Sequence, residues 1–184
     1  MGNFYVNFTT RGPHQAAIAK SLRSAKRSAF VGPSLDALTV FYDEQADTQY
    51  DSAIKVVGEA TSQDLNAPVL AVLNHDDDIL AYWLFVKGKL VDEYNSFPGY
   101  FDDGDDTPSG GDAKKLCDAF AVAGKAKAVS EVLRQRDYTF AFERHRALAE
   151  LLNFPSLYCF TGYRYLADGE VPEGGSGGDF VRIG

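Results

Sequence analysis

The chain has 184 residues, 45% of them hydrophobic, and its 26 acidic and 18 basic residues leave a net charge of −8. A chain of this length fits one domain and buries roughly 70% of its unfolded surface, so it can form a core without disulfides or metals. Nucleic-acid binding requires a positive surface, and the acidic balance therefore argues against a nucleic-acid partner. No apolar run approaches the ~20 residues of a membrane helix and no signal peptide is recognisable, so we expect no membrane partner and a cytoplasmic location.

The first hundred residues predict most of a sheet. Phe4, Val6 and Phe8 alternate with polar or aromatic neighbours, which is the period of a strand. Ile18, Leu22 and Ala25 follow at helical spacing. Strands are expected at 3–10, 28–31, 38–42 and 69–73, and helices at 14–26 and from about residue 51 to residue 65. This order predicts an α+β fold with a ferredoxin-like β-α-β-β-α-β core, although another α+β sheet could share the order.

The stretch 67–101 extends this core. Residues 79–86 are apolar on both faces of a strand and contain Trp83, which we expect in the core. Lys87 and Gly88 predict a tight turn, and 90–94 returns as a further strand, completing a meander of three strands. Residues 96–111 are rich in Pro, Gly and Asp and predict a loop.

The remaining chain, 111–184, is predicted to be mainly helical. Apolar spacing indicates helices at 112–121, 126–136 and 142–153, which we expect to cover the open face of the sheet, and a strand near 157–166. Cys117 and Cys159 stand 42 positions apart with no metal-ligand spacing, so both are predicted to be buried free thiols. The whole of 1–184 is taken as one domain, with 1–100 forming the sheet, and no cofactor is expected.

Two acidic groups could carry function. The sequence His75-Asp76-Asp77-Asp78 is predicted to form a hairpin tip, and a second group of aspartates follows in the loop at 102–106. If the 75–78 turn is tight, the meander places both groups at one end of the sheet. His145 falls on the apolar stripe of its helix and is predicted to be a hydrogen-bonded core residue. The candidate binding residues are His75, Asp76, Asp77, Asp78, Tyr94, Tyr100, Asp102, Asp103, Asp105 and Asp106.

Several segments resemble a family of uncharacterised bacterial cytoplasmic proteins. They are NHDDDIL at 74–80, DEYNSFPGYF at 92–101, GGD at 110–112 with Leu116 and Phe120, ERH at 143–145 and GYRY at 162–165. The family has no known function, so the resemblance implies no functional residue. In composition alone, the chain is also similar to immunity proteins that neutralise toxins.

Three functions remain open at this point. The first is a non-catalytic, immunity-like binding protein that presents acidic and aromatic residues to a basic protein partner, since such charge speeds association. The alternative is a small-molecule or divalent-metal-binding domain, or a hydrolase, built on the 75–78 turn and the Asp-rich loop. The third is a structural subunit. The sequence leaves oligomeric state undecided.

Overall fold

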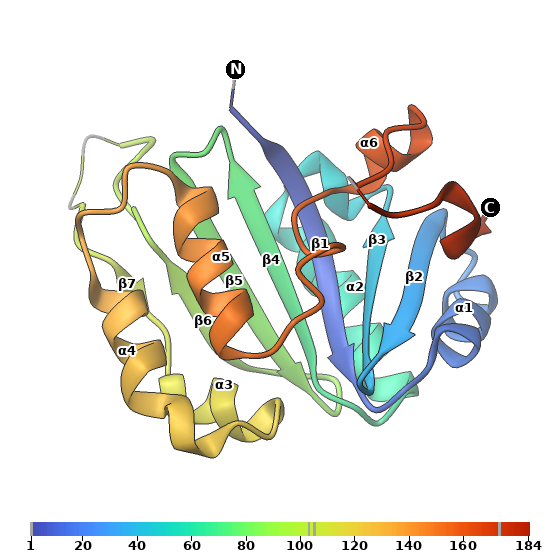
Figure 1. Cartoon of the computed structure of the whole chain (residues 1–184), viewed down its shortest axis with the longest axis horizontal. Helices are drawn as coiled ribbons and strands as arrows, with labels where there is room; N and C mark the ends of the chain where they lie inside the picture. Colours follow the sequence, from blue (N-terminus) through green and yellow to red (C-terminus); the bar gives the residue numbers. More distant parts are fainter. Residues whose placement is uncertain (1, 103, 105, 173) are drawn as a thin grey trace.

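The computed structural model describes residues 2–102, 104, 106–172 and 174–184. Within these residues eight strands form one sheet in the order β7-β6-β5-β4-β1-β3-β2-β8 (Figure 1), and each neighbouring pair is antiparallel. The α+β class is therefore confirmed, and the sheet is larger than the predicted core. The strands are β1 (Phe4–Arg11), β2 (Ala29–Leu35), β3 (Leu38–Asp43), β4 (Val69–His75), β5 (Ile79–Val86), β6 (Lys89–Asn95), β7 (Ser109–Gly110) and β8 (Val181–Ile183).

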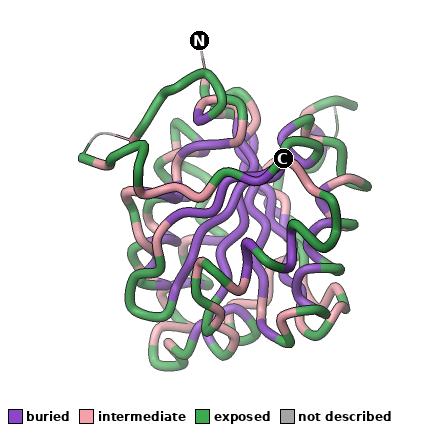
Figure 2. The backbone as a smooth tube through the Cα atoms, turned by 90° about the vertical axis from the view of Figure 1, so that its right-hand side faces the viewer, coloured by how far each residue is buried: buried purple, intermediate pink, exposed green. Residues whose placement is uncertain are grey.

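Helices cover both faces of the sheet. Figure 1 shows α3, α4 and α5 in front of the strands and α2 behind them, and Figure 2 shows the buried strands between more exposed segments. The helices are α1 (Gln15–Ser24), α2 (Asp51–Asp64), α3 (Ala113–Ala119), α4 (Ala126–Arg134), α5 (Ala141–Leu151) and α6 (Tyr163–Ala167), and the short 3₁₀ turns are η1 (Ala46–Thr48), η2 (Ala123–Lys125) and η3 (Gly177–Asp179). The predicted helical layer over the open face is confirmed.

Two apolar cores follow from this arrangement. One lies between the sheet and α1 and α2 and includes Phe8, Phe41 and Trp83, so the core position predicted for Trp83 is confirmed. The other lies between the sheet and α3 to α6 and includes Tyr82 and Leu133. Because helices cover both faces, β5 is buried on both sides, which explains its continuous run of apolar residues.

The predicted strand at 157–166 is wrong. The segment forms turns and then α6, and the late strand is β8, which pairs with β2. The backbone carbonyls of Cys159 and Thr161 accept hydrogen bonds from Asn7 Nδ2 at 2.6 and 3.2 Å, so a side chain of β1 satisfies them in place of a neighbouring strand. The aromatic residues that suggest a strand therefore pack onto the sheet as a covering loop.

Two further features bear on the predictions from sequence. Cys117 and Cys159 are both buried and free, as predicted. Within the described residues, none of the helices combines the length and apolar character needed to cross a membrane.

Candidate functional site

The turn at 75–78 is a tight hairpin between β4 and β5. The backbone N–H of Asp78 donates to the carbonyl of His75 at 3.0 Å, and Asp76 and Asp77 have φ angles of 53° and 61°. Two consecutive positive φ angles define the turn type that suits the right-handed twist of a hairpin, and Asp tolerates this conformation. The turn therefore explains why aspartates occupy the tip.

Two of these aspartates hold the start of the chain. Asp77 Oδ2 accepts hydrogen bonds from the backbone N and the side-chain Nδ2 of Asn3, at 3.2 and 2.9 Å, and Asp76 Oδ1 accepts from Gly2 N at 3.0 Å. Asp77 Oδ1 also accepts from Asn74 Nδ2 at 2.9 Å. Asp77 is thus occupied by internal contacts and has a structural role.

The loop after β6 returns to this turn. Asn95 pairs with Ala81 near the start of β5, and the Tyr100 hydroxyl donates to Asp78 Oδ2 at 2.8 Å. This hydrogen bond raises the pKa of Tyr100. The rings of Tyr100 and Phe101 lie 6.1 and 5.4 Å from the ring of His75. For the described residues, the prediction that both acidic groups lie at one end of the sheet is confirmed, since Asp78 and Asp106 line one pocket.

His75 has a defined orientation. Gln49 Nε2 donates to the Asn74 carbonyl at 2.9 Å, which turns Gln49 Oε1 toward His75 Nδ1 at 2.6 Å. An amide oxygen only accepts hydrogen bonds, so Nδ1 of His75 carries the proton. The edge-on ring of Phe4 lies 5.0 Å away. His75 therefore joins the segment before α2 to the hairpin tip.

Three large aromatic side chains of the described chain are mostly exposed, and each lies in the loop beside this turn or next in the chain to a residue bonded to it. Tyr50 is 73% exposed, Phe101 72% and Phe140 52%. Tyr50 follows Gln49, which is bonded to His75, and Phe140 precedes Ala141, whose N–H donates to the Asp77 carbonyl at 2.6 Å. We name this surface the acidic–aromatic end. It comprises Tyr50, His75, Asp76, Asp78, Tyr100, Phe101, Asp102, Asp106 and Phe140.

Sequence reasoning missed Tyr50 and Phe140. Each stands directly before a helix, far along the chain from the turn, and only the packing of α2 and α5 brings them together. The sequence signal that could have indicated their exposure is their position: each is an aromatic residue directly before an amphipathic helix, outside the apolar stripe of that helix.

Tyr94 is buried and does not belong to the acidic–aromatic end, which corrects its prediction as a binding residue. Its side chain is 3% exposed, its hydroxyl donates to the Leu133 carbonyl at 2.9 Å, and its ring stacks on Tyr82 at 5.3 Å. Burial raises the pKa of Tyr94 to about 12. Alternation along β6 points this side chain into the core beneath α4.

The structure describes only part of the second acidic group, at 102–106. Asp102 and Asp106 are exposed, and Asp106 pairs with Arg136, whereas Asp103 and Asp105 lie outside the described residues. Among the described residues, no three His, Cys, Asp or Glu side chains gather closely enough to hold a metal ion.

A hydrogen-bonded chain leads from the turn into the core. Asn74 Nδ2 donates to the Tyr5 hydroxyl at 3.3 Å, and this hydroxyl lies 2.8 Å from Nδ1 of His145. His145 is 2% exposed, so the prediction of a hydrogen-bonded core histidine is confirmed. Burial lowers the pKa of His145 to about 3, which keeps the imidazole neutral.

No protein-family model matches this sequence, and no curated protein or solved structure shows significant similarity to it.

Proposed function

We propose that this protein is a non-catalytic binding protein that docks a basic protein partner on the acidic–aromatic end. The observation that carries the proposal is the exposure of Tyr50, Phe101 and Phe140, which lie in the loop beside one hairpin turn or next in the chain to residues bonded to that turn. These residues come from three distant parts of the chain, and soluble proteins rarely leave such side chains together in water. Aromatic residues are also enriched at the centres of protein interfaces.

The charge of this end supports a basic partner. Asp76, Asp78, Asp102 and Asp106 bring four carboxylates, and Arg136 neutralises one of them. Arg or Lys side chains of a partner could pair with the remaining carboxylates and lie over the exposed rings. The net charge of −8 would steer such a partner toward this protein.

An immunity protein that neutralises a basic toxin would be one case of this function. The resemblance to a family of uncharacterised bacterial cytoplasmic proteins remains a prediction from the sequence. The alternative of a metal site or hydrolase at the 75–78 turn has less support, because internal hydrogen bonds occupy Asp77 Oδ1 and Oδ2 and His75 Nδ1.

We also propose that β1 to β4 with α1 and α2 form a ferredoxin-like unit within the larger sheet. The support is the strand order β4-β1-β3-β2, in which β3 lies between β1 and β2 as in a split β-α-β motif. The strands β5 to β7 would then extend one edge of this unit and β8 the other.

The test of the docking proposal is an affinity capture from the source organism, compared between the native protein and two matched variants. The first variant combines Tyr50→Ser, Phe101→Ser and Phe140→Ser. The control variant combines Leu35→Ser and Val56→Ser, which are exposed aliphatic residues away from the turn, 44% and 59% exposed. Captured proteins are quantified by mass spectrometry at low and high salt.

We expect a basic protein to be retained by the native protein and the control variant and lost from the aromatic variant. Retention should also fall as salt rises, because exposed charges are screened within about 10 Å at 0.1 M salt. A set of captured proteins that is identical for the native protein and the aromatic variant would refute the proposal.

A further inference from the structure

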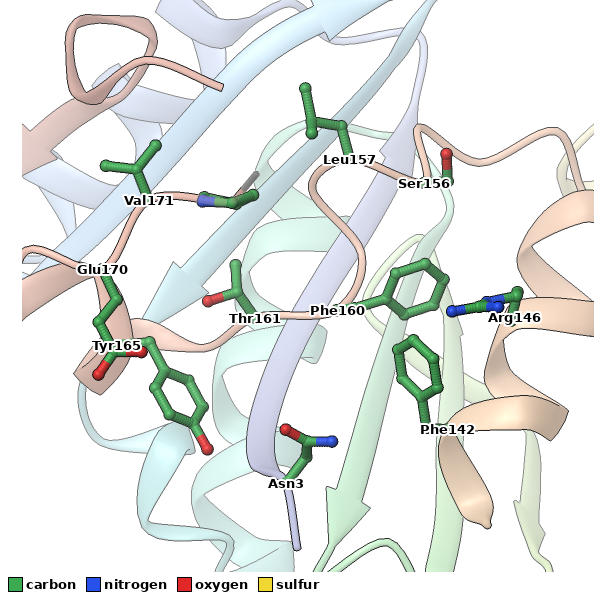
Figure 3. Close-up of a pocket in the computed structure, with 11 residues that line it drawn as sticks. Asn3, Phe142, Arg146, Ser156, Leu157, Phe160, Thr161, Tyr165, Glu170 and Val171 are labelled. Atoms are coloured by element: carbon green, nitrogen blue, oxygen red, sulfur yellow. The ribbon is translucent and has the colours of Figure 1, made fainter. Parts of the chain in front are cut away.

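A pocket of about 510 Å³ lies between α5, the residues before β1 and the covering loop at 156–172. Figure 3 shows Arg146 and Phe142 on one side, Tyr165, Glu170 and Val171 on the other, and Thr161 between them. The volume is within the roughly 300–1,000 Å³ range of small-molecule sites. The pocket shares no residue with the acidic–aromatic end, and Asn3, which lines the pocket, is hydrogen-bonded to Asp77 of the 75–78 turn.

One wall of the pocket is aromatic and carries a positive charge. The rings of Phe142 and Phe160 lie 4.9 Å apart, and the Arg146 guanidinium lies 4.6 Å from the Phe142 ring centre. Within the described part of the chain, Arg146 makes no ion pair. Arg146 is exposed, its guanidinium lies over the Phe142 ring, and its hydrogen-bond donors have no partner among the described residues.

The pocket offers further unused donors. The Tyr165 hydroxyl accepts a hydrogen bond from Phe4 N at 3.3 Å, which leaves its own proton without an acceptor among the described residues. Thr161 is 8% exposed, and within the same residues its hydroxyl has no partner. Because Figure 3 places Tyr165 on the side opposite Arg146, a carboxylate of a ligand would pair with Arg146, and the Tyr165 and Thr161 hydroxyls would be left for acceptors elsewhere on the ligand.

Glu170 limits the negative charge of a ligand that the pocket could bind. Figure 3 places its carboxylate on the side opposite Arg146. A ligand with one carboxylate can turn that group toward Arg146, whereas a second carboxylate would meet the like charge of Glu170.

From this arrangement we propose that the pocket binds a small organic monocarboxylate with an aromatic or aliphatic body. Its carboxylate would pair with Arg146, and its body would lie against Phe142 and Phe160. Leu157 and Val171 would complete the apolar contact. This binding site is independent of the docking function proposed above.

The experiment measures binding of phenylacetate and 4-fluorophenylacetate to the full-length protein by ligand-observed NMR, at concentrations up to about 10 mM, which covers the affinity expected of a fragment. Phenethylamine and phenylacetamide replace the carboxylate by a cation and a neutral amide. A fifth probe, 1,4-phenylenediacetate, carries a second carboxylate. We expect the two monocarboxylates to bind and the other three probes to bind weakly or not at all.

Three variants locate the binding. Arg146→Gln should weaken carboxylate binding by about tenfold, because it removes a charge-assisted pair. Ser156→Phe places a large side chain at an exposed residue of the pocket lining and should block binding while leaving the charge of Arg146 unchanged. Arg23→Gln removes an exposed arginine on α1 and should leave binding unchanged.

A thermal melt of each variant confirms that it is folded, and native-like melting accompanied by lost binding supports the proposal. Glu170→Gln should in addition let 1,4-phenylenediacetate bind. The proposal is overturned if no monocarboxylate binds the native protein, if the cationic or neutral probe binds equally well, or if Arg146→Gln binds as the native protein does.

Discussion

The buried histidine of α5 predicts a specific dependence of stability on pH. The Tyr5 hydroxyl lies 2.8 Å from His145 Nδ1 and accepts a hydrogen bond from Asn74 Nδ2, and His145 Nε2 has no partner within the described residues. Both ring nitrogens of a protonated imidazole carry a proton, so a charged His145 would leave its Nε2–H without an acceptor among the described residues. Burial lowers the pKa of His145 from 6.5 to about 3.

The size of the effect follows from this pKa. Between pH 3 and pH 6.5 the unfolded chain binds a proton at this histidine and the folded protein does not, so stability falls as the pH falls through that window. At about pH 5, which is roughly 1.5 units below the unfolded pKa, the loss is about 2 kcal/mol, because each unit corresponds to about 1.4 kcal/mol. Above pH 6.5 the contribution is fully retained.

Urea unfolding of the native protein and of His145→Gln, at about pH 7.5 and about pH 5, measures this loss. Carboxylates titrate in both proteins, so the difference between their two pH responses isolates His145. We expect the free energy of unfolding of His145→Gln to fall by about 2 kcal/mol less than that of the native protein.

Leu148→Ala is the matched control on the same helix. It opens a cavity at a buried residue and should destabilise the protein by ~2–5 kcal/mol at both pH values while keeping the native pH response. An identical pH response of His145→Gln and the native protein would refute the reasoning, because it would mean that burial does not shift this histidine.

Two further predictions concern the scaffold of the site. Gly58→Ala should destabilise by ~1–3 kcal/mol in a thermal melt, because a Cβ there would lie 2.2 Å from the buried Phe85 ring, outweighing the ~1 kcal/mol gain in helix propensity. Gly124→Ala, with no atom within 4 Å of the new Cβ, is the control and should be neutral or slightly stabilising; equal effects would contradict the packing argument. Asp77→Ala should cost ~1–3 kcal/mol and speed hydrogen exchange at the amide of Asn3, which loses its acceptor; unchanged exchange would show that Asp77 does not hold the N-terminal segment.

The elements that could be predicted from sequence are those with a strong local pattern. The five longer helices and the meander at 69–95 fall close to the predicted positions, since each has a clear apolar period and polar ends. The prediction for 157–166 failed because aromatic residues suit a strand and a packed loop equally well. Which one forms depends on where the backbone finds hydrogen-bond partners, and here Asn7 supplies them from β1.

Only part of the candidate site could be predicted from the sequence. The turn at 75–78 and the loop after β6 are close in sequence to paired strands, so their meeting follows from the meander. The position of Tyr94 was wrong because the sequence leaves open which helices cover each face of β6. Tyr50 and Phe140 lie next to Gln49 and Ala141, which reach the turn through the packing of α2 and α5 on opposite faces of the sheet.

The sequence by itself determined the α+β class, the order of most elements and the acidic character, because local periodicity and composition are properties of neighbouring residues. Only the tertiary structure decided the eight-strand order, the structure of 157–166 and the hydrogen bonds that bring Gln49 and Ala141, the neighbours of Tyr50 and Phe140, to the 75–78 turn. It also decided the pocket beside Arg146. These features join residues that are far apart in the chain, and their contacts depend on how whole layers pack, which no short stretch of sequence encodes.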